Sequence, residues 1–306
     1  MRIVAALGGN ALIRRGQALS VEVQRENLAA AAAALAPLAR GHELVVTHGN
    51  GPQVGWLALQ AAAGQAAGQS PTPLDVLGAE SDGMVGYLVE QALQPHLGGQ
   101  PVATLLTQVR VDAADPAFAT PTKPIGPIYP LSAMQAMASR GWQFARDGDG
   151  WRRVVASPRP LQVMEIEALQ RLLAAGVVVV CAGGGGIPVV ERAGALVGVE
   201  AVVDKDHASA LLARELQADL LLLLTDVDGI CSDFGTPSQR LLAQATPASL
   251  DRLVLPAGSM GPKAAAAADF VRTTGRRAAI GRLDAVAALV AGTAGTQVTR
   301  DETDLR

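Results

Sequence analysis

The chain has 306 residues, a length that suits one large α/β unit or two lobes that share a sheet. Hydrophobic residues make up 49% of the chain and charged residues 17%, which supplies a dry core and excludes a disordered polyelectrolyte. The net charge of −3 gives no general attraction to nucleic acid or to an anionic membrane, so any binding of anions must come from a local site.

The cysteines and the apolar runs point to a cytoplasmic protein. The two cysteines, Cys181 and Cys231, lie in or beside apolar runs and lack the spacing of a metal site. No apolar run approaches the ~20 residues of a membrane span, and the first residues lack the pattern of a signal peptide. We expect a reduced, cytoplasmic protein that binds neither nucleic acid nor membrane.

The first 109 residues alternate short apolar runs, glycine-rich turns and stretches with helical spacing of apolar residues. This alternation is typical of a mostly parallel sheet with helices on both faces. The predicted strands span 2–7, 43–47 and 102–109, and the predicted helices span 21–40 and 74–93.

Residues 115–160 interrupt this pattern with proline, glycine and charged residues. They contain two of the three tryptophans, Trp142 and Trp151, which a flexible linker would not need. We therefore expect a small, β-rich excursion from the main sheet.

The alternation then resumes and continues through the rest of the chain. The predicted helices span 163–175, 205–216 and 264–274, and the predicted strands span 177–181, 219–224, 278–280 and 297–298. We expect an N-terminal lobe, residues 1–218, that carries the excursion, and a C-terminal lobe, residues 219–306.

Several of the predicted strands end in glycine-rich turns, at 8–10, 49–51, 183–186 and 225–229. In an open parallel sheet, ligands bind where the strands end, and glycines there let backbone N–H groups approach an anion. Neither the Walker motif nor the dinucleotide GxGxxG motif is present, so an ordinary P-loop NTPase or Rossmann dehydrogenase is disfavoured.

Lysine is scarce, which makes its positions informative. Of 25 basic residues, 22 are arginine, and the three lysines are Lys123, Lys205 and Lys263. Lys205 and Lys263 open predicted helices, where a cation is unfavourable unless an anion binds at the same terminus. Phosphoryl transfer needs cations spread along the moving group, and Asp206 is placed to hold ammonium groups in position.

Other polar residues remain open to two interpretations. His48 adjoins the 49–51 turn, which it could orient, or it could be a buried histidine with satisfied hydrogen bonds. Asp226 and Asp228 could touch a nucleotide ribose or Mg²⁺, or could cap their turn.

Seven strings of residues, which run in order between residues 3 and 298, resemble those of the carbamate kinases, a group within the amino acid kinase family. The first string begins Ala6-Leu7-Gly8-Gly9-Asn10, the second includes Thr47-His48-Gly49-Asn50-Gly51-Pro52-Gln53 and the third includes Pro121-Thr122-Lys123-Pro124. The others span 151–158, 182–189, 204–206 and 258–263. The resemblance implies a three-layer αβα sandwich with a mostly parallel sheet of about eight strands, a protruding subdomain at about 115–160, and a homodimer.

The same resemblance implies an ATP-dependent phosphotransferase with a carboxyl-type acceptor. Its reaction would be the reversible conversion of ADP and carbamoyl phosphate to ATP and carbamate, with Mg²⁺ bound to the nucleotide and no metal assigned to protein side chains. The N-terminal lobe would bind carbamate or carbamoyl phosphate, and the C-terminal lobe the nucleotide.

The resemblance also assigns residues to each part of the site. The catalytic set would be Lys123, which reaches in from the subdomain, Lys205 and Lys263 on the transferring phosphoryl group, and Asp206, which organises the lysines. The substrate set would be Gly8, Gly9, Asn10, Gly49, Asn50 and Gly51. The nucleotide set would be Gly183, Gly184, Gly185, Thr225, Asp226, Val227, Asp228, Gly229, Ser259, Met260 and Pro262.

The sequence departs from the family pattern at a few positions. Ala6 stands where many amino acid kinases have a lysine, a role that Lys123 would take over. Glu80 and Asp82 stand where the resemblance leads us to expect a neutral residue and a glutamine, and Asp233 stands where asparagine is common.

Two alternatives remain. The chain could be another amino acid kinase that acts on a different small acid, although no arginine clamp for a second carboxylate is evident. It could also be a non-catalytic nucleotide-binding module, which the presence of all three lysines disfavours.

Overall fold

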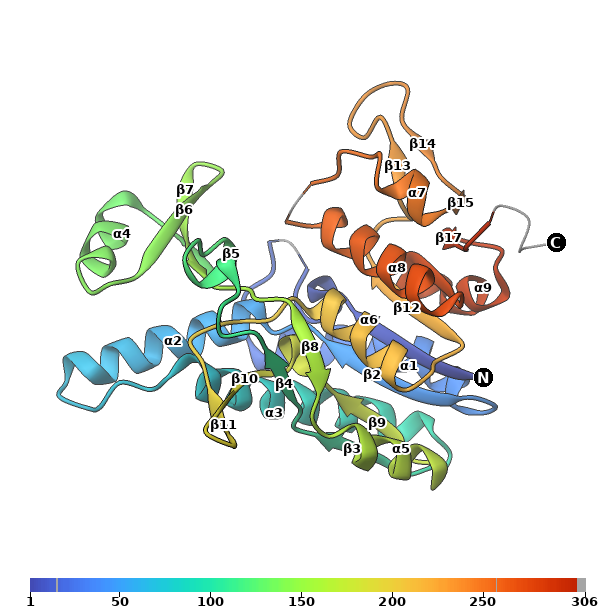
Figure 1. Cartoon of the computed structure of the whole chain (residues 1–306), viewed down its shortest axis with the longest axis horizontal. Helices are drawn as coiled ribbons and strands as arrows, with labels where there is room; N and C mark the ends of the chain where they lie inside the picture. The colour runs from blue at the N-terminus through green and yellow to red at the C-terminus, as the bar shows by residue number, and fades with distance from the viewer. Residues whose placement is uncertain (15, 257, 302–306) are drawn as a thin grey trace.

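The seven predicted strands and one that was not predicted, β15, form one eight-stranded sheet in the computed structural model, which describes residues 1–14, 16–256 and 258–301. The strand order is β15-β17-β16-β12-β1-β2-β9-β3, and all these strands are parallel except β15 and β17, which run the opposite way. The bounds are β1 Arg2–Leu7, β2 Glu43–His48, β3 Val102–Leu105, β9 Val178–Cys181, β12 Leu220–Thr225, β15 Gln244–Ala245, β16 Arg277–Arg282 and β17 Thr296–Val298. The predicted α/β class and the mostly parallel sheet are confirmed (Figure 1).

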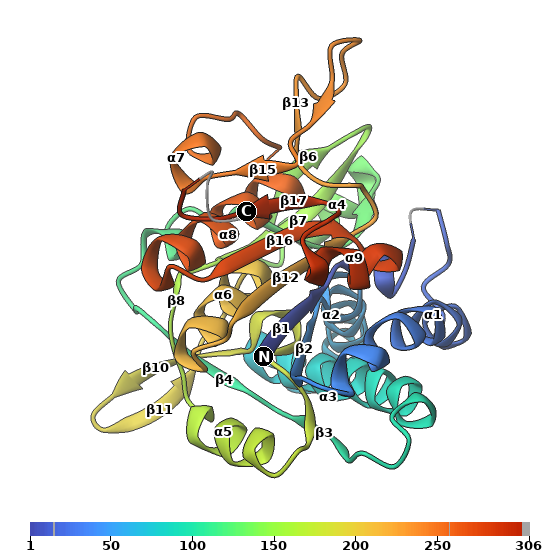
Figure 2. The ribbon, with the colours of Figure 1, turned by 90° about the vertical axis from the view of Figure 1, so that its right-hand side faces the viewer.

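Helices cover both faces of this sheet (Figure 2). In β1, Ile3, Ala5 and Leu7 pack in the core with α1, α3 and α9, whereas Val4 and Ala6 pack in the core with α5, α6 and α8. Because both faces are covered, the inner strands are apolar throughout rather than alternating with polar residues. The bounds are α1 Val21–Ala39, α3 Leu74–Leu93, α5 Ile166–Ala174, α6 Lys205–Glu215, α8 Met260–Thr274 and α9 Val286–Ala291.

The predicted excursion projects from one end of the sheet and is hereafter called the flap (Figure 1). Its three strands are antiparallel, in the order β5-β7-β6, and a helix that the sequence did not predict, α4, packs against them. The Arg153 guanidinium lies 3.9 Å from the centre of the Trp142 ring and the Arg146 guanidinium 5.6 Å from that of Trp151, so both tryptophans help to fold the flap. The bounds are β5 Lys123–Tyr129, α4 Leu131–Ala138, β6 Gln143–Asp147 and β7 Gly150–Val155.

The flap packs against α2, Gly51–Ala66, and two glycines meet at this contact. A Cβ atom on Gly55 would lie 2.0 Å from the Cα atom of Gly126 in β5. Only glycine permits backbones to approach this closely, so Gly55 sets how the flap stands over the sheet.

Other elements differ from the predictions for identifiable reasons. The predicted strand 102–109 is divided between β3 and β4 because the chain turns at Thr107, whose hydroxyl donates to the Leu105 carbonyl. Helix α2 was not predicted at all. The predicted helix 163–175 begins later, at Ile166, because Val163 ends β8.

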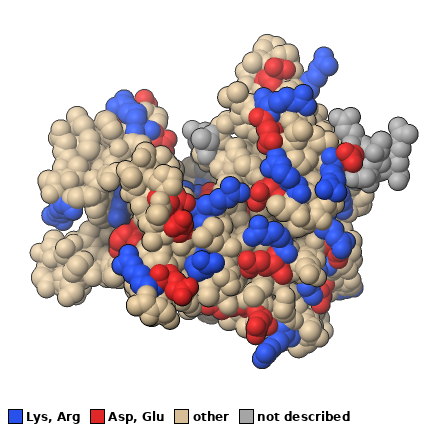
Figure 3. Space-filling view, viewed as in Figure 1, with Lys and Arg blue, Asp and Glu red and all other residues tan. Residues whose placement is uncertain are grey.

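A smaller sheet and several short elements complete the structure. The smaller sheet has the order β11-β10-β4-β8. The bounds are β4 Gln108–Val111, β8 Pro160–Val163, β10 Ile187–Arg192, β11 Ala195–Gly198, β13 Cys231–Ser232, β14 Arg240–Leu241 and α7 Pro247–Leu250. Among the described residues, no helix combines the length and hydrophobicity that a membrane span requires. On the face shown in Figure 3, basic and acidic side chains are interspersed.

Candidate active site

A cleft of about 1770 Å³ opens where β1, β2 and β12 end. The flap lines one side of it and the C-terminal part of the chain lines the other, with all three lysines in its wall. Parallel strands that end together leave their following turns at one edge of the sheet, which is where the sequence predicted a site.

Three helices begin in this cleft, and one of them, α2, starts at the predicted 49–51 turn. Helix α2 follows Asn50, α6 follows Asp204 and α8 follows Ser259. The first N–H groups of α2 and α8 have no side-chain cap, and the positive dipole end of each of the three helices favours a bound anion. Their convergence makes the cleft suitable for a ligand with several negative charges.

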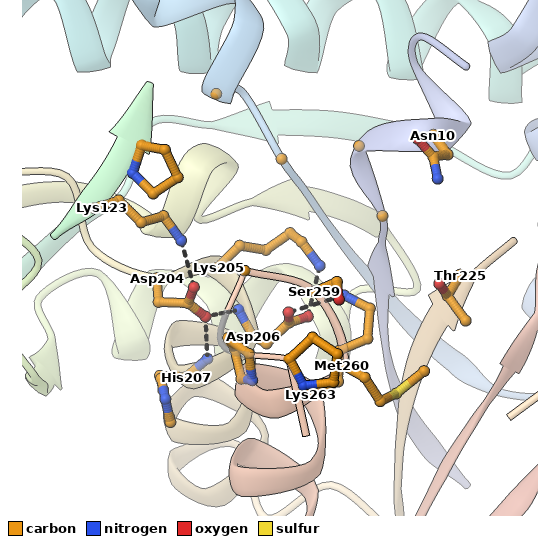
Figure 4. Close-up of a pocket in the computed structure, with 18 of the residues that line it drawn as sticks. Asn10, Lys123, Asp204, Lys205, Asp206, His207, Thr225, Ser259, Met260 and Lys263 are labelled. Atoms are coloured by element: carbon orange, nitrogen blue, oxygen red, sulfur yellow. Dashed lines mark hydrogen bonds and ion pairs between the residues drawn. The ribbon is translucent and has the colours of Figure 1, made fainter. Parts of the chain in front are cut away.

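Asp206 joins two of the lysines at the centre of the cleft (Figure 4). Its Oδ1 atom lies 2.6 Å from the Lys205 Nζ atom, and its Oδ2 atom lies 2.9 Å from the Lys263 Nζ atom. The three side chains are between 6% and 12% exposed. One carboxylate therefore holds two ammonium groups side by side, as predicted for Lys205 and Lys263.

The electrostatics of this cluster follow from its burial. Burial alone would raise the pKa of Asp206, but the Lys205 and Lys263 ammonium groups hold that pKa well below its usual range. Burial lowers the pKa of Lys205 to about 8; Lys263 acts in the same direction and Asp206 against it. At neutral pH the cluster therefore carries two positive charges and one negative, and the surplus favours an anionic ligand.

Lys123 reaches the cleft from the flap but pairs with a different carboxylate. Its Nζ atom contacts the Oδ2 atom of Asp204, so Asp206 does not hold all three lysines. The other Asp204 oxygen caps α6 by accepting from the backbone N–H groups of Asp206, at 2.9 Å, and His207, at 3.3 Å. Burial would raise the pKa of Asp204, and the Lys123 charge lowers it below the usual value.

Sequence reasoning did not single out Asp204 as a functional residue. The available signal was its place directly before a helix that begins with a lysine, since aspartate is a preferred N-cap residue. That the second carboxylate oxygen would receive a lysine from 81 residues away could not be deduced from spacing.

The predicted substrate residues all line the cleft. Gly8, Gly9 and Asn10 follow β1, and Gly49, Asn50 and Gly51 follow β2. The Asn50 amide donates to the Ser81 hydroxyl at 2.7 Å, and the Asn10 amide donates to the Asp226 carboxylate at 2.6 Å. Both asparagines are thus held in place by residues from other elements.

The turn Gly183–Gly185 lies beside the predicted substrate residues rather than the other predicted nucleotide residues. A Cβ atom on Gly184, whose φ is +66°, would lie 2.1 Å from the Asn50 side-chain amide, and one on Gly185 would lie 2.4 Å from the Val203 carbonyl oxygen. Gly184 lines the cleft, whereas Gly183 and Gly185 are not part of its lining.

The remaining predicted nucleotide residues gather on the C-terminal side of the cleft. Thr225 and Ser259 face it across from Lys123 (Figure 4), and the lining there includes Asp226, Val227, Gly229, Met260 and Pro262. Asp228 is exposed and is not part of the lining; its carboxylate lies 3.9 Å from Arg282. Arg282, which sequence reasoning missed, also donates to the Asp226 carbonyl at 3.3 Å.

A dedicated metal site is not part of this arrangement. Within residues 1–14, 16–256 and 258–301, no three His, Cys, Asp or Glu side chains lie together in a way that could hold a metal ion.

Comparisons with known proteins agree with the resemblance. The amino acid kinase family matches residues 1–282. The carbamate kinase of Rhizobium meliloti is 50% identical over 310 residues, with 100% of this chain and 95% of the relative covered, and that of Escherichia coli K12 is 48% identical, with 97% and 99% covered. The solved structure of the Giardia lamblia carbamate kinase bound to AMP-PNP has a TM-score of 0.89 at 38% identity, with 98% of both chains covered.

Proposed function

The chain belongs to the amino acid kinase family, and from that premise we propose that it transfers a phosphoryl group reversibly between ATP and carbamate. The carbamate kinases with which it shares about half its residues over nearly its whole length support the substrate. The observation that carries the proposal in this chain is the convergence of its only three lysines, with three helix N-termini, on one cleft.

In the direction of ATP synthesis, an oxygen of the ADP β-phosphate attacks the phosphorus of carbamoyl phosphate. The bond from phosphorus to the carbamate oxygen breaks, and carbamate leaves with the electron pair. No proton changes place, because both the attacking and the leaving oxygens are anionic. The protein therefore needs no general base, and its task is to position two anions and to neutralise charge along the line of transfer.

The lysines divide this task according to where they lie. Lys205 and Lys263, 2.6 Å and 2.9 Å from Asp206, act on the oxygens of the moving phosphoryl group. Lys123 acts from the flap, at the carbamate end. Asp206 offsets the mutual repulsion of Lys205 and Lys263, which keeps both charged and aimed at the substrate.

The two ends of the cleft take different substrates. Residues 1–218 bind carbamoyl phosphate through the turns at 8–10 and 49–51, with Gly184 added to that end because of its contact with Asn50. Residues 219–306 bind the nucleotide through the turns at 225–229 and 259–262. In this proposal Mg²⁺ is bound as part of the nucleotide substrate, since it is usually held by phosphates with one or two carboxylates. Asp226 is one of the carboxylates that line this end of the cleft.

The chain functions as a cytoplasmic homodimer in this proposal. The edge strand β3 is only half-buried along its whole length, and two large apolar side chains beside it are exposed, Tyr87 at 52% and Leu106 at 48%. An unpaired edge next to exposed apolar side chains is typical of a surface that another chain covers.

The experiment that tests the reaction compares phosphoryl donors. ATP formation from MgADP is measured with carbamoyl phosphate, acetyl phosphate and N-acetylglutamyl phosphate at equal concentrations. We expect carbamoyl phosphate to give a kcat/KM at least about a hundredfold above the others. The N-acetylglutamyl group is too large for a pocket shaped by two glycine turns, and the methyl group of acetyl phosphate cannot donate the hydrogen bonds of the carbamoyl NH2 group. A preference for another donor would contradict the substrate while leaving the kinase, and no turnover with bound nucleotide would contradict the enzyme.

A further inference from the structure

Two buried ionisable side chains lie directly behind the carbamate end of the cleft, and the transfer step does not use them. His48 ends β2, immediately before the 49–51 turn, and Asp82 lies in α3; both side chains are fully buried. The His48 Nε2 atom lies 3.6 Å from the Asp82 Oδ1 atom. A buried pair of this kind needs an explanation, because burying polar groups without partners is costly.

Helix α3 connects both glycine turns through consecutive residues. The Asp82 Oδ1 atom accepts a hydrogen bond from the Gly183 N–H group at 3.0 Å. The preceding residue, Ser81, accepts from the Asn50 amide at 2.7 Å. The 49–51 and 183–185 turns are therefore held to one helix, and their spacing depends on how Ser81 and Asp82 are bonded.

The hydrogen bonds of His48 determine where its own proton lies. Its Nδ1 atom is 3.1 Å from the Gly49 carbonyl oxygen, which can only accept, so Nδ1 carries the hydrogen. In a neutral imidazole, Nε2 then presents a lone pair, and it faces a carboxylate oxygen. Among the described residues, neither His48 Nε2 nor Asp82 Oδ2 has a hydrogen-bond partner. Two facing acceptors repel unless a proton is shared between them.

The surroundings decide which group holds this proton. Burial raises the pKa of Asp82 to about 7; Glu165 adds to the rise, and the N–H groups of Thr107 and Gly183 oppose it. Burial, helped by the Lys205 charge and opposed by the Gly49 carbonyl, lowers the pKa of His48 to about 4. The other ionisable group against the pair is the buried Cys181 thiol, whose pKa is raised by burial and by Asp82, so it stays neutral.

We propose that Asp82 is a positioning residue whose protonated carboxyl group bridges His48 to Gly183 and thereby sets the spacing of the two glycine turns that hold carbamoyl phosphate. This inference rests on the proposed function for the identity of the substrate. Loss of the shared proton leaves a buried negative charge facing a lone pair, and the two turns then separate.

The kinetic test replaces Asp82 in two ways. One atom, Asp82 Oδ1, faces both Gly183 and His48. Asp82→Asn keeps an oxygen that accepts from Gly183 but carries no hydrogen on it for His48, whereas Asp82→Leu removes both contacts. We expect Asp82→Leu to raise the KM for carbamoyl phosphate by at least about tenfold and to leave the KM for MgADP within about twofold. We expect Asp82→Asn to raise the KM for carbamoyl phosphate by more than about threefold but by less than Asp82→Leu does, because it keeps the contact with Gly183 and loses the one with His48. The matched control is Glu80→Gln, at an exposed side chain two residues before Asp82 in α3, and this variant should behave as the wild type does.

The pH profile separates a shared proton from simple packing. In the wild type, kcat/KM for carbamoyl phosphate should fall above about pH 7 by up to about tenfold per pH unit, and more steeply once Lys205 also loses its proton near pH 8. The Asp82→Asn variant should lack the fall that begins above about pH 7 and keep the fall that follows from Lys205. An identical profile in the wild type and Asp82→Asn would overturn the proposal.

A spectroscopic measurement tests the pair without any substrate. The infrared carbonyl band of a protonated carboxylic acid should be present in the wild type at pH 6, should vanish as the pH rises past about 7, and should be absent from Asp82→Asn. If Asp82 is already ionised at pH 6, the proposal fails even when carbamoyl phosphate is turned over. If carbamoyl phosphate is not a substrate, the band still reports the shared proton, so the two failures are distinguishable.

Discussion

At the scale of single residues, Asp206 explains how two cations can share one cleft. Without it, Lys205 and Lys263 would repel each other in a site where both are about nine-tenths buried. Removing one partner from a buried ionic cluster leaves uncompensated charge, at a cost of about 3–5 kcal/mol. The scarcity of lysine in the sequence singled out Lys205 and Lys263 as candidates, because compact ammonium groups are needed where a planar guanidinium does not fit.

We predict that Lys123→Arg, Lys205→Arg and Lys263→Arg each lower kcat by at least about tenfold, because the guanidinium cannot place its charge where the ammonium does. The matched control is Arg171→Lys, the reverse exchange at a side chain that is 83% exposed and outside the cleft. Initial rates are measured beside circular dichroism spectra that report folding. Three lysine variants with near-wild-type turnover would refute the assigned roles.

At the scale of elements, the start of α6 combines a structural and a functional role in one carboxylate. Asp204 caps the helix with one oxygen and holds the flap lysine with the other. The helix start could be predicted from the string Asp204-Lys205-Asp206, because aspartate favours the position before a helix. The partner of Lys123 could not, because it depends on how the flap folds over the sheet.

Asp204→Ala should lower the free energy of unfolding by about 1 kcal/mol through loss of the cap and should also lower kcat by at least about tenfold by releasing Lys123. Ser20→Ala is the matched control, since the Ser20 hydroxyl caps α1 by accepting from the Val23 N–H group at 3.2 Å. That variant should lose similar stability and no activity. Chemical denaturation and initial rates distinguish the two; equal activity losses would contradict the account.

The contact between the flap and α2 leads to a prediction for two variants in that helix. Gly55→Ala places a Cβ atom 2.0 Å from Gly126 and should push the flap, with Lys123, away from the cleft, lowering kcat by at least about tenfold. Gly64→Ala meets only the flexible end of Gln69 and should be neutral or stabilising, because alanine favours helices. Full activity in Gly55→Ala would show that this contact does not position Lys123.

The predictable and unpredictable elements differ in physical terms. Buried parallel strands such as Leu220–Thr225 are evident from their apolar composition and following glycines. Helix Gly51–Ala66 is rich in alanine, glycine and glutamine, so it shows no clear apolar face, although Pro52 in its first turn was a usable start signal. The contact between His48 and Asp82 joins β2 to α3, and spacing along the chain carries no information about it.

At the scale of the whole molecule, one sheet takes strands from both residues 1–218 and residues 219–306 and brings their turns to a single edge. Strands β1 and β12 pair in parallel, so residues 8–10 and 225–229 follow neighbouring strands. The hydrogen bond between Asn10 and Asp226 joins the turns that we propose for carbamate and for the nucleotide. In this account, donor and acceptor therefore meet in one cleft without a hinge between separate domains.

We expect the protein to sediment at twice the chain mass at micromolar concentration. Leu106→Glu puts a charge on the exposed apolar surface beside β3 and should shift the equilibrium to monomer by disfavouring burial of that surface. Analytical ultracentrifugation of both proteins makes the comparison, with Val197→Glu, which is exposed in β11, as the control. A monomeric wild type would contradict the proposed homodimer.

The most direct test of the central claim follows the transferred phosphoryl group by ³¹P NMR. The protein is mixed with MgADP and carbamoyl phosphate, and ³¹P NMR records both substrates and products, beside a variant in which Lys123, Lys205 and Lys263 are all arginine. The account predicts that the carbamoyl phosphate signal decreases and the ATP γ-phosphate signal increases mole for mole in the wild type, with neither change in the variant. Release of inorganic phosphate in place of ATP, or unchanged transfer by the variant, would contradict it.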